Sequence, residues 1–180
     1  MQRTIKFLAF AFFTTVILAS CGNNASLQHY YVDNQESKNF ISQDLPLSMV
    51  EIDKSNFTDE QNEAYNSVNK LNFLGYKANK NDIEAYNTEI AKVKTILSDS
   101  KYNDLMEFSD KGNKIYVKYI GNDDEADEVV VFGSAKEMGF GIVRILGDDM
   151  NPEKMVTLIN AMQKANIEED QIENIMNFFK

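Results

Sequence analysis

The strongest constraint on the fold is a change in hydrophobic pattern at Leu105, after which apolar and polar residues alternate with a period of two. This alternation predicts β-strands, because successive side chains of a strand point to opposite faces of the sheet. Short turn-forming runs separate the apolar segments and favour antiparallel neighbours. We therefore predict a meander of four consecutive strands, built from LMEFS (105–109), KIYVKYI (114–120), EVVVFG (128–133) and FGIVRILG (140–147).

Helix start signals are found on both sides of this region. Thr58 and Gln61 have the spacing of a capping box, in which each side chain bonds the other residue's backbone. Pro152 suits the first position of a helix, with Asn151 as the cap. Two more helices are predicted to start at Asn81 with Glu84 and at Asn166 with Glu169, and two more strands are predicted at 47–53 and 71–76.

The predicted helices have apolar faces that need a surface to cover. Residues 129–132 are apolar on both faces of their strand, so at least the middle strands should be covered by helices on one side. The predicted fold class is therefore α+β, an antiparallel sheet of about four to five strands with helices packed on one face. The helix after Asn81 is expected to face the core through Ile83, Tyr86, Ile90, Val93 and Leu97.

The N-terminus is organised like a secretory signal. Arg3 and Lys6 form a short positive region, residues 7–18 are mostly apolar, and Ala19 and Ser20 are small. The apolar segment is shorter than the roughly 20 residues that a membrane-spanning helix needs. We therefore predict that residues 1–20 are a signal peptide that directs export.

Residues 18–21, Leu-Ala-Ser-Cys, resemble the lipobox of bacterial lipoproteins. The resemblance implies cleavage between Ser20 and Cys21 and a diacylglyceryl group on the sulfur of Cys21. Several acyl chains would hold the protein firmly, since each buried methylene adds about 0.8 kcal/mol and a single chain binds only weakly. An ordinary secreted protein with a chance cysteine at the cleavage site is the alternative.

Other roles for Cys21, the only cysteine, are disfavoured. An intramolecular disulfide needs a second cysteine. A zinc site needs several Cys or His ligands, and His29 is the only histidine. No lysine or arginine lies between Cys21 and Lys38 to activate the thiol as a nucleophile. We therefore expect no metal and no cofactor.

Loss of the signal makes the chain more acidic. The sequence has 18 basic and 28 acidic residues, and removal of Arg3 and Lys6 leaves 16 against 28, a net charge of −12. Such a chain repels phosphate backbones, so we expect no nucleic-acid partner.

The region after Cys21 is polar and lacks periodic apolar residues. Residues 21–40 are therefore predicted to be a flexible tether, with a root-mean-square span of about 25 Å. Within it, residues 30–32 could be a recognition patch, cover part of the body or extend into solvent. Residues 41–180 are expected to form a single α+β domain, which is long enough to bury a core.

Five segments of the body follow one another in a familiar order: LPLSMVEI (45–52), VNKLNFLGY (68–76), YNDLMEFSDKGNKIYVKYI (102–120), EVVVFG (128–133) and FGIVRILGDDMNPEKMVTLI (140–159). This order resembles the domain-of-unknown-function 4252 family, small lipoproteins of Bacteroidota. The segments contain no catalytic motif, so the resemblance implies a fold and a location and assigns no active site.

Two features of the body are candidate sites. Arg144, the one arginine after the signal, lies in an apolar strand and is a candidate ligand contact, because its planar fork suits a carboxylate or phosphate. An internal ion pair is the alternative. The acidic cluster in residues 123–128 is expected to be a solvated turn, since it lacks the spacing and the glycine of a calcium-binding EF-hand loop.

The body lacks histidine, cysteine and the common nucleophile and nucleotide motifs. We therefore expect no enzyme but a binding module of the bacterial cell envelope, held through Cys21 at the outer membrane, facing the periplasm, and able to bind an envelope protein or a small ligand. The alternative is a carboxylate-based hydrolase of envelope glycans, which requires a cleft that holds two acids.

Overall fold

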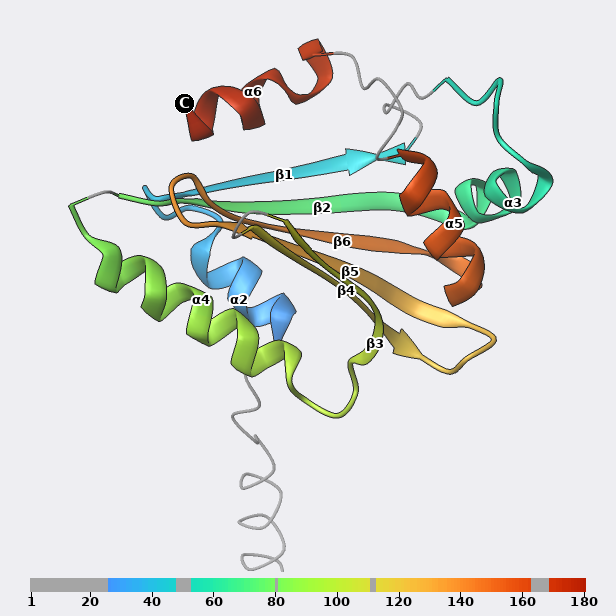
Figure 1. Ribbon diagram of the computed structural model, residues 1–180, viewed down its shortest axis with the longest axis horizontal. Coiled ribbons are helices and arrows are strands. Elements are labelled where there is room, and N and C mark those ends of the chain that lie inside the picture. The colour runs from blue at the N-terminus through green and yellow to red at the C-terminus, as the bar shows by residue number, and fades with distance from the viewer. Residues whose placement is uncertain (1–25, 48–52, 80, 111–112, 163–168) are drawn as a thin grey trace, which may run out of the picture.

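The computed structural model describes residues 26–47, 53–79, 81–110, 113–162 and 169–180, which form an α+β fold (Figure 1). These described residues include six strands and five helices. The strands are β1 (Phe40–Pro46), β2 (Val68–Lys77), β3 (Asn103–Asp110), β4 (Asn113–Gly121), β5 (Ala126–Ala135) and β6 (Gly139–Met150). The helices are α2 (Leu27–Asn34), α3 (Asp59–Ser67), α4 (Ile83–Leu97), α5 (Pro152–Met162) and α6 (Glu169–Phe179).

The strands form one antiparallel sheet in the order β1-β2-β6-β5-β4-β3. Each of β3, β4 and β5 pairs with the next strand along the chain, which confirms the predicted meander. The sheet then continues past β6 with β2 and β1, which come from the N-terminal half. It is larger than the predicted four to five strands, and β1 lies in a segment for which no strand was predicted. The strand predicted at 47–53 falls largely outside the described residues.

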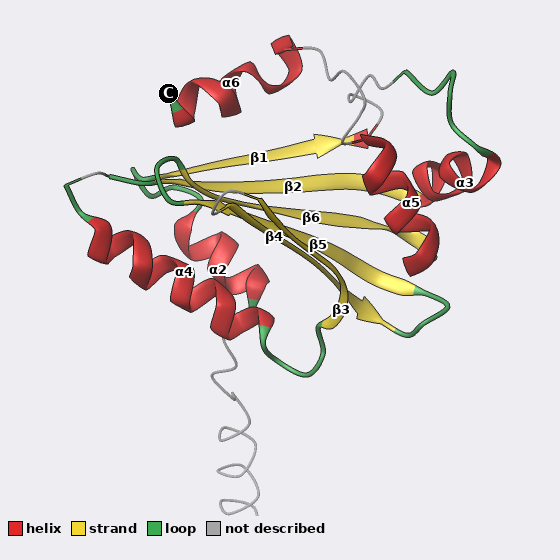
Figure 2. Ribbon diagram, viewed as in Figure 1, coloured by secondary structure: helices red, strands yellow, loops and turns green. Residues whose placement is uncertain are grey.

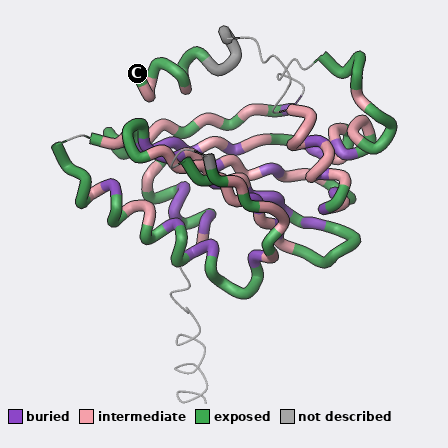
Figure 3. The backbone as a smooth tube through the Cα atoms, viewed as in Figure 1, coloured by how far each residue is buried: buried purple, intermediate pink, exposed green. Residues whose placement is uncertain are grey.

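Helices cover both faces of the sheet (Figure 2). One buried cluster joins the sheet to α2 and α4, and a second joins it to α3 and α5. β5 contributes Val130 and Phe132 to the first cluster and Val129 to the second. The prediction of helices on one face is therefore wrong, because a strand that is apolar on both sides needs cover on both sides. Figure 3 shows the buried positions concentrated along the strands and on the helices.

α2 belongs to the folded body, although its residues were predicted to lie in a flexible tether. Ser26 caps the helix by accepting a hydrogen bond from the His29 amide. Leu27, Tyr30 and Tyr31 are only 1%, 6% and 7% exposed. The tether prediction is wrong for residues 26–40, and residues 21–25 lie outside the described part. A helix of 8 residues has little stability of its own, so burial of its large side chains holds it in place.

The predicted helix starts are largely confirmed. Thr58 and Gln61 form the complete capping box of α3, and Asn151 accepts a hydrogen bond from the Lys154 amide at the start of α5. α4 is capped by Asp82, one residue after the predicted cap. Ile83, the first residue of α4, is 59% exposed and does not join the predicted core stripe. The predicted cap Asn166 lies outside the described residues.

α6 packs on β2 near its own C-terminus (Figure 1). A Cβ atom on Gly75 would lie 2.9 Å from the ring of Phe179 and 3.0 Å from the ring of Phe73. The missing side chain therefore allows the end of α6 to approach the sheet closely.

The packing of α2 leads to a stability prediction. We expect Leu27→Ala to lower the free energy of unfolding by about 2–5 kcal/mol, because the deleted side chain is fully buried. Urea unfolding of the body, residues 22–180, measures this loss. Gln28→Ala, on the exposed side of the same helix, is the control and should change stability by less than about 0.5 kcal/mol. Equal effects of the two substitutions would show that α2 is not part of the cooperative fold.

Candidate functional site

A polar row crosses the sheet on the face that α2 and α4 cover. The register places one residue of each strand in this row, and five of the six side chains are polar or charged. The rest of this face is mainly aromatic and aliphatic. In sheet order the members are Asp44, Asn72, Arg144, Val130, Lys118 and Asp104.

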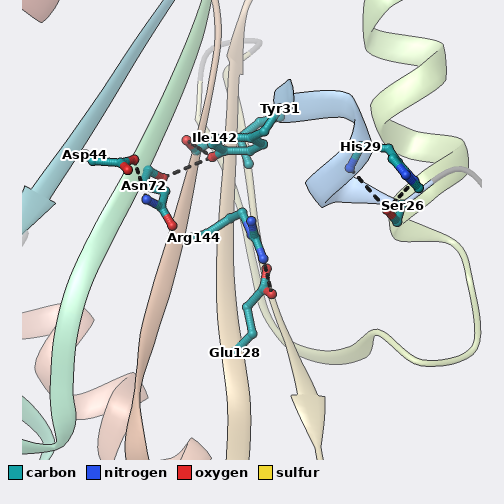
Figure 4. A network of polar contacts seen from close by, with 8 residues as sticks. All are labelled: Ser26, His29, Tyr31, Asp44, Asn72, Glu128, Ile142 and Arg144. Carbon is teal, nitrogen blue, oxygen red and sulfur yellow. Dashed lines mark hydrogen bonds and ion pairs between the residues drawn. The ribbon is translucent and has the colours of Figure 1, made fainter. Parts of the chain in front are cut away.

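Arg144 forms a two-point ion pair with Glu128 (Figure 4). Its Nε donates to Oε1 at 2.7 Å and its Nη2 donates to Oε2 at 2.8 Å. The two side chains are only 13% and 9% exposed. The hydrogen bond to Glu128 raises the pKa of Arg144, and this effect outweighs the opposing effect of burial. The Arg144 guanidinium is therefore held in its charged form inside the protein.

Tyr31 connects this pair to α2 and to the backbone of the sheet. Its hydroxyl lies 2.8 Å from the Ile142 carbonyl and 3.0 Å from the Asn72 carbonyl, both of which can accept its proton (Figure 4). The Arg144 guanidinium lies 5.5 Å from the centre of the tyrosine ring, which is within the range of a cation–π interaction. Burial raises the pKa of Tyr31, so the phenol stays protonated.

Asn72 extends the network to the edge of the sheet. Its side-chain amide donates a hydrogen bond to the carboxylate of Asp44 on β1 (Figure 4). Asn72 is itself only 7% exposed, whereas Asp44 is exposed. The network therefore runs from the protein interior to solvent over β6, β2 and β1.

The structure places Arg144 in the internal ion pair that was the alternative to a ligand contact. Two of its nitrogen atoms donate hydrogen bonds to Glu128. The contact between Arg144 and a ligand stays a prediction. Glu128 was predicted both as part of the solvated acidic turn and as the first residue of the strand at 128–133. The structure confirms the strand, and the solvated turn is wrong for this residue, which is buried two residues before Val130 on the same face of β5.

A cleft of about 530 Å³ lies between the C-terminal part of α4 and strands β3 and β4. This volume is within the range of small-molecule sites, roughly 300–1,000 Å³. Lys118, a member of the polar row, forms an ion pair with Asp104 at 2.6 Å, so the row reaches the cleft. The apolar lining residues are Leu97, Leu105, Met106, Tyr116 and Phe132, and the polar ones are Lys94, Ser98, Asp104, Glu107 and Lys118.

Two acids, Asp104 and Glu107, line the cleft. Asp104 is 85% exposed and is paired with Lys118. Glu107 is three residues further along β3 and is also exposed. The hydrolase alternative stays a prediction.

The turn at 121–125 is ordered by Asn122, whose side chain accepts hydrogen bonds from the amides of Asp124 and Glu125. Within the described residues, no group of three or more His, Cys, Asp or Glu side chains could hold a metal ion. Ser20 and Cys21 lie outside the described part of the chain.

Comparison with known families assigns the body of the protein. The model of the family described as Domain of unknown function (DUF4252) matches residues 30–158. The chain belongs to the DUF4252 family. The DUF4252 match starts inside α2 and ends inside α5, so it contains the polar row, Glu128, Tyr31 and the cleft. Neither a curated protein nor a solved structure matches the chain.

None of the helices in the described ranges is both long enough and apolar enough to cross a bilayer.

The Arg144–Glu128 pair leads to a second stability prediction. We expect Arg144→Met to lower the free energy of unfolding by about 3–5 kcal/mol, because Glu128 then remains buried without a partner. The double variant Arg144→Met/Glu128→Leu should recover most of this loss, since an apolar replacement of a buried ion pair is often neutral. Urea unfolding of all variants provides the measurement.

The control for this prediction is Glu63→Gln, which breaks the more exposed ion pair with Lys154 and should cost less than about 1 kcal/mol. An additive loss in the double variant would contradict the account of a coupled buried pair.

Proposed function

We propose that the protein is a lipid-anchored module of the bacterial cell envelope that binds a partner without catalysing a reaction. The anchor is a diacylglyceryl group on Cys21, and the body faces the periplasm from the outer membrane. The signal-like N-terminus and the lipobox-like residues 18–21 support the anchor. The net charge of −12 expected after cleavage favours a protein partner or a small ligand over nucleic acid.

The observation that carries the binding role is the cleft between α4 and β3–β4. The charge of Arg144 is paired with that of Glu128 in the protein interior. Lys94 and Glu107, in contrast, make no ion pair with any residue that the structure describes. Both charged groups line the cleft beside the apolar side chains of Leu97 and Tyr116. Such a lining suits a ligand or peptide that has an apolar body and charged groups of both signs.

The anchor is tested by metabolic labelling. We expect radioactive palmitate to label the native chain in its bacterial host, and Cys21→Ser to abolish labelling and release the protein from the membrane fraction. The reason is that the thiol is the acceptor of the diacylglyceryl group. An unlabelled native chain that washes out of the envelope would refute the anchor.

The cleft is tested by site-specific photo-crosslinking in the bacterial host. We expect p-benzoylphenylalanine at Glu107, inside the cleft, to form a specific covalent adduct. The same residue at Glu173, on the exposed surface of α6, is the matched control and should form none. Ser98→Trp fills the cleft from α4 and should weaken the Glu107 adduct. Equal crosslinking at both positions, or an adduct that Ser98→Trp does not affect, would argue against the cleft as the binding site.

A further inference from the structure

The start of α2 fixes where the body is connected to Cys21. Leu27 is 1% exposed and packs in the same cluster as Tyr102 and the sheet. The side chain of Tyr102 also interacts with the backbone of Leu27. Residues from Ser26 onward therefore move with the body, and only the four residues 22–25 separate it from Cys21.

This connection is short compared with the body. Five residue steps from Cys21 to Ser26 span at most about 18 Å, even when the chain is fully extended. A flexible tether up to residue 40 would have spanned about 25 Å on average and could extend much further. With its anchor at Cys21, the start of α2 must therefore stay close to the headgroups.

The start of α2 belongs to the layer that α2 and α4 form over one face of the sheet, called here the α2–α4 layer (Figure 1). Leu27 lies beside Tyr102, which follows the C-terminal end of α4. Further along α2, the Tyr30 hydroxyl donates a hydrogen bond of 2.8 Å to Glu89 on α4. The two helices are thus side by side, and a short connection to the first residue of α2 brings α2 and the C-terminal end of α4 near the membrane.

The outer surface of the α2–α4 layer is suited to this position. It exposes one large apolar side chain on α2, since Val32 is 57% exposed. Its charge is close to balanced, although the protein as a whole is strongly acidic. Over 26–34 and 82–101 the exposed charged residues are four acids and three lysines, namely Asp33, Asp82, Glu84, Asp99, Lys92, Lys94 and Lys101. A surface with little net charge is repelled only weakly by anionic lipids.

We infer that the outer surface of the α2–α4 layer lies against the lipid headgroups, and that the opposite side of the sheet, which carries α3, α5 and α6, points away from the membrane. This inference rests on the proposed anchor at Cys21. The occupant of the surface is the bilayer itself.

The orientation is tested by energy transfer from the protein to the membrane. Because lipid blocks the thiol of Cys21, Val32→Cys and Met176→Cys each introduce a single free thiol, at exposed sites on α2 and on α6. The full lipidated chain, labelled with a donor dye, is placed in vesicles of phosphatidylethanolamine and phosphatidylglycerol that contain headgroup-linked acceptors. We expect severalfold stronger transfer from position 32 than from position 176.

A linker variant is the matched control. Insertion of about 20 Gly and Ser residues between Ala25 and Ser26 adds a flexible span of about 25 Å and should remove most of the difference between the two positions. Equal transfer from the two positions of the chain without the linker would overturn the inference. Transfer between position-32 dyes on different chains, without transfer to headgroups, would also overturn it and would indicate a second copy of the chain on this surface.

The anchor and the orientation fail in distinguishable ways. A chain that incorporates no palmitate refutes the proposed anchor. A chain that incorporates palmitate but shows no preference for position 32 keeps the anchor and refutes the orientation.

Discussion

The structure depends on one constraint, which is that the central strands are apolar on both faces. Val129, Val130 and Phe132 of β5 are each at most 1% exposed, although they point to opposite sides of the sheet. One helical layer could bury only half of these side chains. The chain therefore supplies α3 and α5 for one face and α4 together with α2 for the other. The need for a second layer explains why a short helix from the N-terminal segment is drawn into the body.

The Arg144–Glu128 pair follows from the same geometry. It lies on the face that α2 covers, where Tyr31 shields it and bonds to the backbone of β2 and β6. A buried ion pair adds little net stability, because desolvation of both charges offsets their attraction. It does penalise wrong strand registers, since a shift of one residue would move Arg144 to the opposite face and leave Glu128 unpaired. We interpret the pair as a determinant of the register between β5 and β6.

The sequence predicted what depends on neighbouring residues. The meander and the caps of α3 and α5 are local patterns, and the structure contains them. It did not predict the pairing of β2 with β6 or the burial of α2, because both depend on contacts between distant segments. The burial of Glu128 was not predicted, because its partner Arg144 lies 16 residues further along the chain. The cleft could not be predicted, because α4, β3, β4 and β5 build it from residues spread over 94–132.

With the proposed anchor at Cys21, the helical layers on the two faces of the sheet have different surroundings. The cleft is bordered by Leu97 and Ser98 at the end of α4 and by Asp104 in β3, on either side of the segment that contacts the first residue of α2. A short connection to Cys21 would therefore hold this border near the headgroups together with α2. Molecules that reach the cleft would then be those found close to the membrane, and envelope amphiphiles have the mixed apolar and charged character that its lining suits. The fold would in this way restrict the choice of ligand by position as well as by contact.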